Sequence, residues 1–431
     1  MSLRKTTTFW LGALVWLAFR AGSGLASGPL LVTGPSASSP GQPIHWTLSP
    51  IPYKTDQGNL GTQTNAQANT LVSDAFNVWH NVSTANISFT QDGQLIEDIT
   101  AANILAFSDA IHTCGDPGQP TNSIIYDLDG SIITALGEDQ NSVMGFAGAT
   151  CVDTFAGTYT RGWAVLNGRF IDGQPDSPSN REVTVDEFKA VFIHEFGHLV
   201  GHDHTQINLN CLTGCSATDL EGVPTMFPVM VNPSGQSTPH TDDKASLSSL
   251  YPAASFDTTL GRIQGHVFFA DGATPAQGYN VIARKVGDPR RIAVSYCSGD
   301  LYTAALGNPL PPPGQDTESP WGSHDQSLIG TYDLRGLPAG DYTIEVEAIN
   351  NSGDFPFVGG SALGPIGREL GFQYKMPGTC SPQYLNYPSS PTDLCSAQTT
   401  VTVGAGSVVN THTDVVLLGT PPRYDAWEDG P

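Results

Sequence analysis

The chain has 431 residues, enough for two or three domains, and carries 18 Lys+Arg against 41 Asp+Glu for a formal net charge of −23. Nucleic acids and anionic membrane surfaces are bound through clustered Lys and Arg, so this balance argues against both as partners. A hydrophobic fraction of 39% excludes a mostly disordered chain.

Residues 1–26 predict a secretory leader. Arg4 and Lys5 precede an apolar run over 9–19, and small residues follow up to Ala26. The run is too short to cross a bilayer, which takes about 20 apolar residues. No second run of that length follows, so we expect a secreted, extracellular protein without a transmembrane segment.

Residues 27–42 are rich in Ser, Gly and Pro and predict a flexible lead-in. Residues 43–252 alternate between helix and strand patterns, and we predict one domain there. Apolar residues recur at helical spacing from Leu71 to Trp79. Short apolar or β-branched runs predict strands at 103–107, 123–126 and 163–167.

A second helix is predicted to begin at Thr184, because Thr184 and Glu187 form a capping-box pattern before an apolar run. A short helix over 242–251 is expected to close the domain. The fold class expected for residues 43–252 is therefore α+β, with a mixed, twisted sheet.

After a linker at 253–259 the pattern changes to short alternating runs separated by Gly and Pro turns. This sequence pattern predicts an all-β sandwich over 260–420, followed by an acidic tail at 421–431. The expected strands lie within 261–269, 279–284, 291–296, 340–348 and 399–418.

The chemistry-bearing segment is 194–204, which holds four of the 11 histidines. His194 and His198 are one helical turn apart, so both rings project from one face and can bind one cation. Gly201 lets the backbone leave the helix and return with His204 as a third nitrogen. Three protein ligands and one open position are typical of a catalytic zinc site.

We expect different roles for Glu195 and His202, which lie next to these ligands in the sequence. Glu195 follows the first ligand, and we expect its carboxylate beside the open metal position. His202 fits neither the helical pair nor the turn-delivered ligand, and we interpret it as a bystander. The competing interpretation of the whole segment is a polar helix whose histidines are solvated or satisfy core carbonyls.

The pattern His194-Glu195-x-x-His198-x-x-Gly201-x-x-His204 with a downstream Met resembles the metzincin zinc metallopeptidases, and most closely the matrixins. The resemblance covers about 43–252 and is strongest over 188–230. It implies a zincin-like fold with an active-site helix and one catalytic Zn²⁺.

The same resemblance implies that Met226 lies in a turn beneath the imidazoles, with Met230 as the competing candidate. It also implies that Phe227 and Pro228 line a substrate pocket. The activity that follows is that of a secreted zinc endopeptidase, in which Glu195 activates a zinc-bound water against extracellular protein or peptide substrates.

Two other functions stay open. The first is a metal-binding extracellular adhesion or binding protein whose protease-like domain has lost turnover. The second is metal-dependent hydrolysis of a non-peptide amide. Nothing in the sequence predicts the oligomeric state.

A weaker signal surrounds Asp127 and Asp129, which partly match a calcium-binding loop. Ile132 occupies the place where an EF-hand needs Gly. Two interpretations remain, a Ca²⁺ site or a turn with solvated carboxylates.

The remaining expectations concern the disulfides and the fold of the C-terminal part of the chain. Export favours disulfides, with Cys211–Cys215 and Cys114–Cys151 as natural pairs and one of the three C-terminal cysteines left over. The segments 261–267 and 332–342 resemble the carboxypeptidase-regulatory-like, or transthyretin-like, β-sandwich. That resemblance implies a fold and says little about function.

Overall fold

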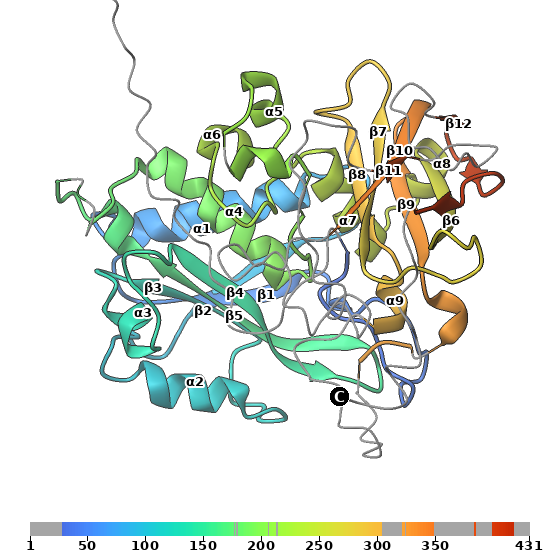
Figure 1. Ribbon diagram of the computed structural model, residues 1–431. Helices are drawn as coiled ribbons and strands as arrows, with labels where there is room; N and C mark the ends of the chain where they lie inside the picture. Colours follow the sequence, from blue (N-terminus) through green and yellow to red (C-terminus); the bar gives the residue numbers. More distant parts are fainter. Residues whose placement is uncertain are drawn as a thin grey trace, which may run out of the picture.

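The computed structural model describes residues 28–175, 177, 180–205, 207–212, 214–303, 321–323, 325–348, 383–384 and 399–417. The described chain is α+β, with helices packed around one mixed sheet and two further sheets beside it (Figure 1). The predicted leader and acidic tail lie outside these residues. Within the described ranges, no helix is long and apolar enough to span a bilayer.

The first sheet has five strands in the order β2-β1-β3-β5-β4. Neighbours in this order are parallel except β4, which is antiparallel to β5 at the sheet edge. The mixed sheet is confirmed, as are the strands expected at 123–126 and 163–167. The strands are β1 (Ile51–Thr55), β2 (Phe89–Gln94), β3 (Asn122–Asp127), β4 (Gly145–Asp153) and β5 (Thr158–Asn167).

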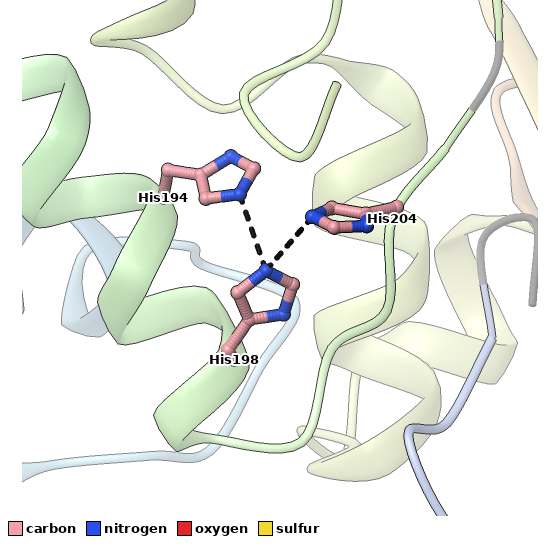
Figure 2. A group of neighbouring side chains, drawn as sticks. All are labelled: His194, His198 and His204. Atoms are coloured by element: carbon pink, nitrogen blue, oxygen red, sulfur yellow. Dashed lines mark hydrogen bonds between the residues drawn. The ribbon is translucent and has the colours of Figure 1, made fainter. Parts of the chain in front are cut away.

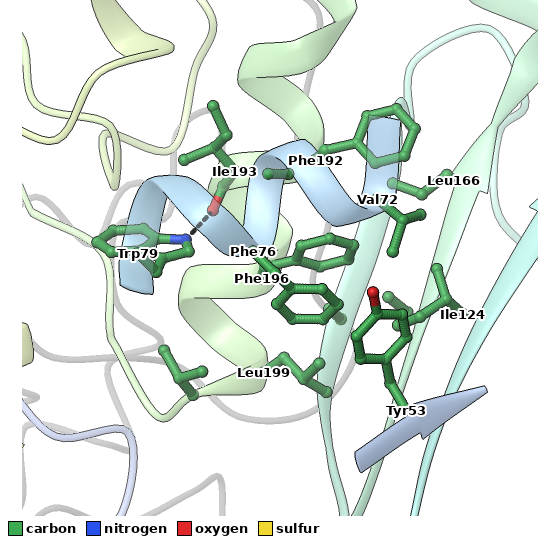
Figure 3. Packing of buried hydrophobic residues seen from close by; sticks show 14 of the residues in the cluster. Tyr53, Val72, Phe76, Trp79, Ile124, Leu166, Phe192, Ile193, Phe196 and Leu199 are labelled. Carbon is green, nitrogen blue, oxygen red and sulfur yellow. Dashed lines mark hydrogen bonds between the residues drawn. The ribbon is translucent and has the colours of Figure 1, made fainter. Parts of the chain in front are cut away.

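Two long helices, α1 (Asn65–His80) and α4 (Val185–Leu199), cover one face of this sheet (Figure 1). Phe76 of α1 stacks on Phe196 of α4 with 4.0 Å between ring centroids. The Trp79 indole Nε1 donates to the Ile193 carbonyl at 2.8 Å (Figure 3). These contacts fix α4, which carries the first two histidines, against α1 and the sheet.

The predicted strand at 103–107 is wrong, because this segment begins the helix α2 (Ile104–His112). The Asn103 side chain accepts a hydrogen bond from the Thr100 amide at 2.7 Å, which turns the chain into the helix. Ile104 and Ile111, two helical turns apart, are its buried residues, whereas Leu105 is 58% exposed. Together with α3 (Ser131–Ala135), α2 covers the other face of the sheet (Figure 1).

The start of the lead-in predicted at 27–42 packs against the rest of the chain in its described residues. Leu31 and Val32 are fully buried, and the Leu30 amide donates to the Gly201 carbonyl at 2.8 Å. The Ile44 amide donates to the Leu31 carbonyl at 2.9 Å. Composition missed this order because the pairing partners lie far away in sequence.

The start of α4 is confirmed as a capping box. The Thr184 hydroxyl accepts from the Glu187 amide at 3.2 Å, and the Glu187 carboxylate accepts from the Thr184 amide at 2.8 Å. Gly201, with φ of 95°, follows the end of the helix in the expected left-handed conformation. The helix expected over 242–251 is α7 (Thr241–Leu250).

The described residues within 261–417 form two sheets whose buried side chains share one hydrophobic core. One sheet holds β7 (Tyr279–Lys285), β8 (Ala293–Cys297), β10 (Gly340–Ala348), β11 (Gln383–Tyr384) and β12 (Thr400–Val403). The other holds β6 (Gly261–Phe268), β9 (Thr331–Leu337), β13 (Val408–Val409) and β14 (Val415–Val416). Ala245 of α7 belongs to the sandwich core, so α7 joins the two parts.

Short helical turns complete the described chain. They are η1 (Gly168–Ile171), η2 (Leu209–Leu212), α5 (Ala217–Glu221), α6 (Pro233–Gln236), α8 (Phe256–Thr259), α9 (Asp300–Thr303) and η3 (Gln326–Leu328).

Both expected disulfides, Cys114–Cys151 and Cys211–Cys215, are present. Cys297 is a buried free thiol, and the other two C-terminal cysteines lie outside the described residues.

Candidate metal centre

Three imidazole rings converge on one point at the end of α4 (Figure 2). His194 and His198 project from the helix, and His204 is delivered by the turn that follows it. The Nε2 atom of His198 lies 3.1 Å from the Nε2 atoms of both His194 and His204. The three predicted ligands are therefore brought together, with all ligand atoms within 4.8 Å of one another.

The outer nitrogens of two rings are held by the backbone. Nδ1 of His194 lies 2.8 Å from the Thr225 carbonyl, and Nδ1 of His198 lies 2.9 Å from the His202 carbonyl. A carbonyl only accepts, so each Nδ1 carries the proton and each Nε2 presents a lone pair. This tautomer is assigned from the hydrogen-bond partners.

Two lone pairs facing each other at 3.1 Å make no hydrogen bond unless a ring gains a second proton. Burial opposes that proton: it lowers the pKa of His198 to about 4 and holds the pKa values of His194 and His204 well below their ordinary range. Neighbouring histidines lower the latter two further. At neutral pH the site therefore turns uncharged lone pairs toward a common point.

This donor set suits a divalent transition metal. Imidazole nitrogens bind Zn²⁺ at about 2.0–2.1 Å, which places tetrahedral ligand atoms roughly 3.3 Å apart. The 3.1 Å separations in the structure are close to that spacing. Imidazole also suits copper and nickel, so the geometry indicates a metal class with Zn²⁺ as a good fit.

A turn at Thr225–Met226 supports the rings from below. The Asp243 carboxylate accepts from the Thr225 amide at 2.9 Å and from the Met226 amide at 3.0 Å. Burial raises the pKa of Asp243 to about 6. Sequence reasoning missed Asp243 as a support, because it lies on α7 and nothing local marks it.

Met226 lies where the resemblance placed it, buried against α4. A Cβ added at Gly197, the residue before His198, would lie 2.3 Å from the Met226 sulfur. The side chain is 2% exposed and belongs to the main core. Met230, the competing candidate, packs at the edge of that core.

Glu195 lies against the edge strand β4. Its side chain is 1% exposed, and a Cβ added at Gly145 would lie 3.3 Å from its Cγ. Burial raises the pKa of Glu195 well above its ordinary range, and a hydrogen bond from the Ala147 amide opposes the rise. Its Oε1 has no hydrogen-bond partner among the described residues.

His202 contributes its backbone rather than its ring. Its carbonyl orients His198, while its ring packs edge-on against Trp79 at 4.9 Å between centroids. Burial lowers the pKa of His202 to about 3, and within the described part of the chain neither ring nitrogen has a hydrogen-bond partner. The spacing of the histidines in the sequence excludes the His202 ring as a ligand, but it does not show that the His202 carbonyl contacts His198.

Phe227 and Pro228 are not placed as an accessible pocket wall. Phe227 is fully buried in a separate cluster with Val32, Val229 and Cys297, and Pro228 is buried as well. Both residues are thus enclosed in the described structure, and the substrate-pocket wall implied by the resemblance stays a prediction.

Asp127 and Asp129 cap a turn. Asp127 accepts from the amides of Gly130 at 3.0 Å and Ile133 at 2.8 Å, and Asp129 accepts from the Ser131 amide at 3.1 Å. Asp127 is fully buried whereas Asp129 is exposed, so the turn with a solvated carboxylate fits Asp129 but not Asp127. Within the described ranges, only the histidine triad groups three metal-ligating side chains.

Comparisons with known proteins return no family relationship. No family model matches the chain, and no curated protein matches it. Among solved structures, BcpA, the major pilin subunit of Bacillus cereus, is 10% identical over 38% of this chain and 31% of that chain, with a TM-score of 0.18. GBS52, the minor pilin of Streptococcus agalactiae, is 15% identical over 40% of this chain and 50% of that chain, with a TM-score of 0.16.

This chain thus spans at most half the length of either pilin, and at these TM-scores the likeness carries no fold or function to it. The predicted membership of the matrixins and the endopeptidase activity based on it are nevertheless wrong by these comparisons. Neither that resemblance nor the one to carboxypeptidase-regulatory-like sandwiches has a matching family model, and no curated protein matches the chain.

The physical reason for the error is that the motif is local. The spacing of the three histidines allows three imidazoles to reach one point from a helix and the following turn. Any chain with such a site needs that spacing, whatever its fold. It constrains neither the rest of the fold nor what approaches the metal. The α+β class stands without the metzincin assignment.

Proposed function

We propose that this chain is a secreted metal-binding protein of the adhesion or binding class, in which His194, His198 and His204 hold one Zn²⁺. The observation that carries the proposal is the convergence of three Nε2 atoms, two of them in rings whose Nδ1 atoms are held by carbonyls. A cation is the natural partner for lone pairs arranged in this way.

Enclosure of the site favours binding over turnover. The side chains of His194, His198 and His204 are 1%, 3% and 9% exposed, and Glu195 is 1% exposed. A metal ion bound so deeply joins α4 to the loop that delivers His204 and contributes to folding free energy. A polymeric substrate has little access to side chains this enclosed.

The bound ion would supply a Lewis-acid position for one further oxygen or nitrogen donor. The residues of the chain do the rest. The carbonyls of Thr225 and His202 fix the ring orientations, and Asp243 holds the turn that carries Thr225. Glu195 can exchange a hydrogen bond with a carboxylate or water at the open position.

Metal stoichiometry tests the binding step. Protein stripped with EDTA and dialysed against Zn²⁺ should retain one zinc per chain by elemental mass spectrometry, and His198→Ala should retain none. His112→Ala is the matched control, because His112 is an exposed histidine whose Nδ1 lies 2.7 Å from a carbonyl of its own helix. Equal zinc content in His198→Ala and wild type would overturn the proposal.

Turnover is tested separately on the zinc-loaded protein. Incubation with casein, and with a small acyl amide, should release no product above the level of His198→Ala. Hydrolysis that disappears in Glu195→Gln would contradict the binding class and make the chain an enzyme.

A further inference from the structure

His204 differs from the other two metal ligands in how its ring is held. The Nδ1 atoms of His194 and His198 lie 2.8 Å and 2.9 Å from backbone carbonyls. Across the residues that the structure describes, no hydrogen bond holds Nδ1 of His204. The position of its Nε2 therefore depends on how the backbone on either side of His204 is fixed.

Thr205, the residue after His204, connects this loop to strand β8. Its side chain is fully buried, and its amide donates to the Met226 carbonyl at 3.1 Å. Its hydroxyl lies 3.3 Å from the hydroxyl of Ser295, which is also buried. Ser295 donates to Oδ1 of Asp242, from its amide at 2.7 Å and from its hydroxyl at 3.3 Å. A carboxylate accepts and does not donate, so the Thr205 hydroxyl is the donor to Ser295.

Farther along the same loop, Ile207 and Asn208 pack on the hairpin of β7 and β8. Ile207 is 1% exposed and forms a small cluster with Ile282 of β7 and Ala293 of β8. Asn208 is also buried, and its Oδ1 accepts from Nη1 of Arg284 on β7 at 3.1 Å. The loop that delivers His204 thus rests on the C-terminal sheet through two polar contacts and one apolar contact.

Arg284 is itself fixed by that sheet. Its Nε pairs with the Glu345 carboxylate of β10, and the two side chains are 11% and 9% exposed. Its Nη1 also donates to the Pro289 carbonyl at 3.1 Å. A planar guanidinium bound on several sides loses little further freedom, so it offers Asn208 a donor in a set position.

We propose that Ser295 on β8 and Arg284 on β7 are positioning residues for the metal ligand His204. The inference rests on the proposed function, because it takes the triad to bind zinc. Neither residue touches the metal. They hold Thr205 and Asn208, and these fix the backbone from which the third imidazole reaches the other two. Groups that orient metal ligands in this way typically contribute about 10- to 100-fold to metal affinity.

Zinc affinity of the full chain tests the inference. Each protein is stripped with EDTA and titrated with Zn²⁺ against a chromophoric chelator, well below its Tm. Ser295→Ala leaves the Thr205 hydroxyl without its acceptor, and the Kd for zinc should rise about tenfold. Arg284→Lys keeps a positive charge for Glu345 but lacks the second nitrogen that reaches Asn208, so a similar rise is expected.

Arg262→Lys is the matched control. Arg262 lies on β6, in the other C-terminal sheet, and binds Asp333 through Nε and Nη2. Its replacement weakens a comparable ion pair, so Tm should fall while the Kd for zinc stays at the wild-type value. Loading with Co²⁺ adds a readout of ligand geometry. The visible d–d bands should change in Ser295→Ala and Arg284→Lys and match wild type in Arg262→Lys.

The contact is also tested from the loop side. Thr205→Ser retains the hydroxyl and should keep the wild-type Kd for zinc, whereas Thr205→Val removes it and should raise Kd about tenfold. In the Thr205→Val background, Ser295→Ala should have little further effect, because the contact between the two hydroxyls is already lost. This pair of variants decides the question if Ser295→Ala or Arg284→Lys does not fold.

Three results would overturn the inference. Unchanged zinc affinity and Co²⁺ bands in Ser295→Ala and Arg284→Lys would do so, as would an equal loss of affinity in Arg262→Lys or in Thr205→Ser. Each of these leaves the proposed function intact as long as wild type retains one zinc per chain. Wild type that binds no zinc would overturn the proposed function, and this inference with it.

Discussion

Gly197 is the position where a single methyl group tests how closely the turn beneath the metal centre is packed. A Cβ at residue 197 would lie 2.3 Å from the Met226 sulfur and 2.9 Å from its Cε, against about 3.5–4.0 Å for a comfortable contact. Met226 cannot simply withdraw. Its amide is bound by Asp243 and its carbonyl accepts from the Thr205 amide.

Two opposing effects set the magnitude for Gly197→Ala. Overpacking of a filled core costs about 1–3 kcal/mol, whereas Gly to Ala inside a helix gains about 1 kcal/mol. The net expectation is a loss of about 1 kcal/mol in the free energy of unfolding. In a Met226→Ala background the clash with Met226 is absent and only a 3.1 Å approach to the Trp79 ring remains, so the same substitution should become stabilising by up to about 1 kcal/mol.

Urea unfolding of the four proteins, each stripped of metal, measures this cycle. The expected result is a reversal of sign between the Met226 and Met226→Ala backgrounds, with a coupling of about 2 kcal/mol. If Gly197→Ala stabilises the wild-type background as much as the Met226→Ala background, the packing of Met226 against α4 is refuted.

Three further outcomes follow from single contacts. Burial raises the pKa of Asp56 to about 6, so protonation of Asp56 stabilises the fold fully below about pH 3.8, and this stabilisation is lost as the pH rises through 6. Relative to Asp56→Asn, the free energy of unfolding of wild type in urea should therefore increase by about 2 kcal/mol from about pH 7.5 to about pH 4.5. Thr184→Ala removes the cap of α4 and should cost about 1 kcal/mol in the same assay, while Thr184→Ser should retain most of it. Trp79→Phe breaks the 2.8 Å bond to Ile193 and should cost about 1–2 kcal/mol by thermal unfolding with one zinc still bound; an unchanged Tm would contradict a role for that bond.

The sequence predicted the parts of the site that are encoded locally. The ligand spacing, the capping box at Thr184 and the turn at Gly201 each depend on residues within a few positions, and all three hold in the structure. The strand at 123–126 was equally visible, because a strand buried on both faces is a continuous apolar run.

What the sequence could not predict depends on contacts across long separations. Asp243 supports a turn some 17 residues earlier in the chain, and the segment 28–31 is ordered by the loop 201–203. The helix beginning at Ile104 matches a strand in its apolar content, and only the spacing of its buried residues Ile104 and Ile111 indicates a helix. The family assignment failed for the same reason, since a local motif was extended to a whole domain.

Zinc K-edge X-ray absorption on the zinc-loaded protein tests the metal centre most directly. The structure predicts three imidazole nitrogens at about 2.0–2.1 Å from the metal, with multiple-scattering features of three rings that fall to two in His204→Ala. A first shell of oxygens only, or a spectrum that His204→Ala leaves unchanged, would contradict the assignment of His194, His198 and His204 as the metal ligands.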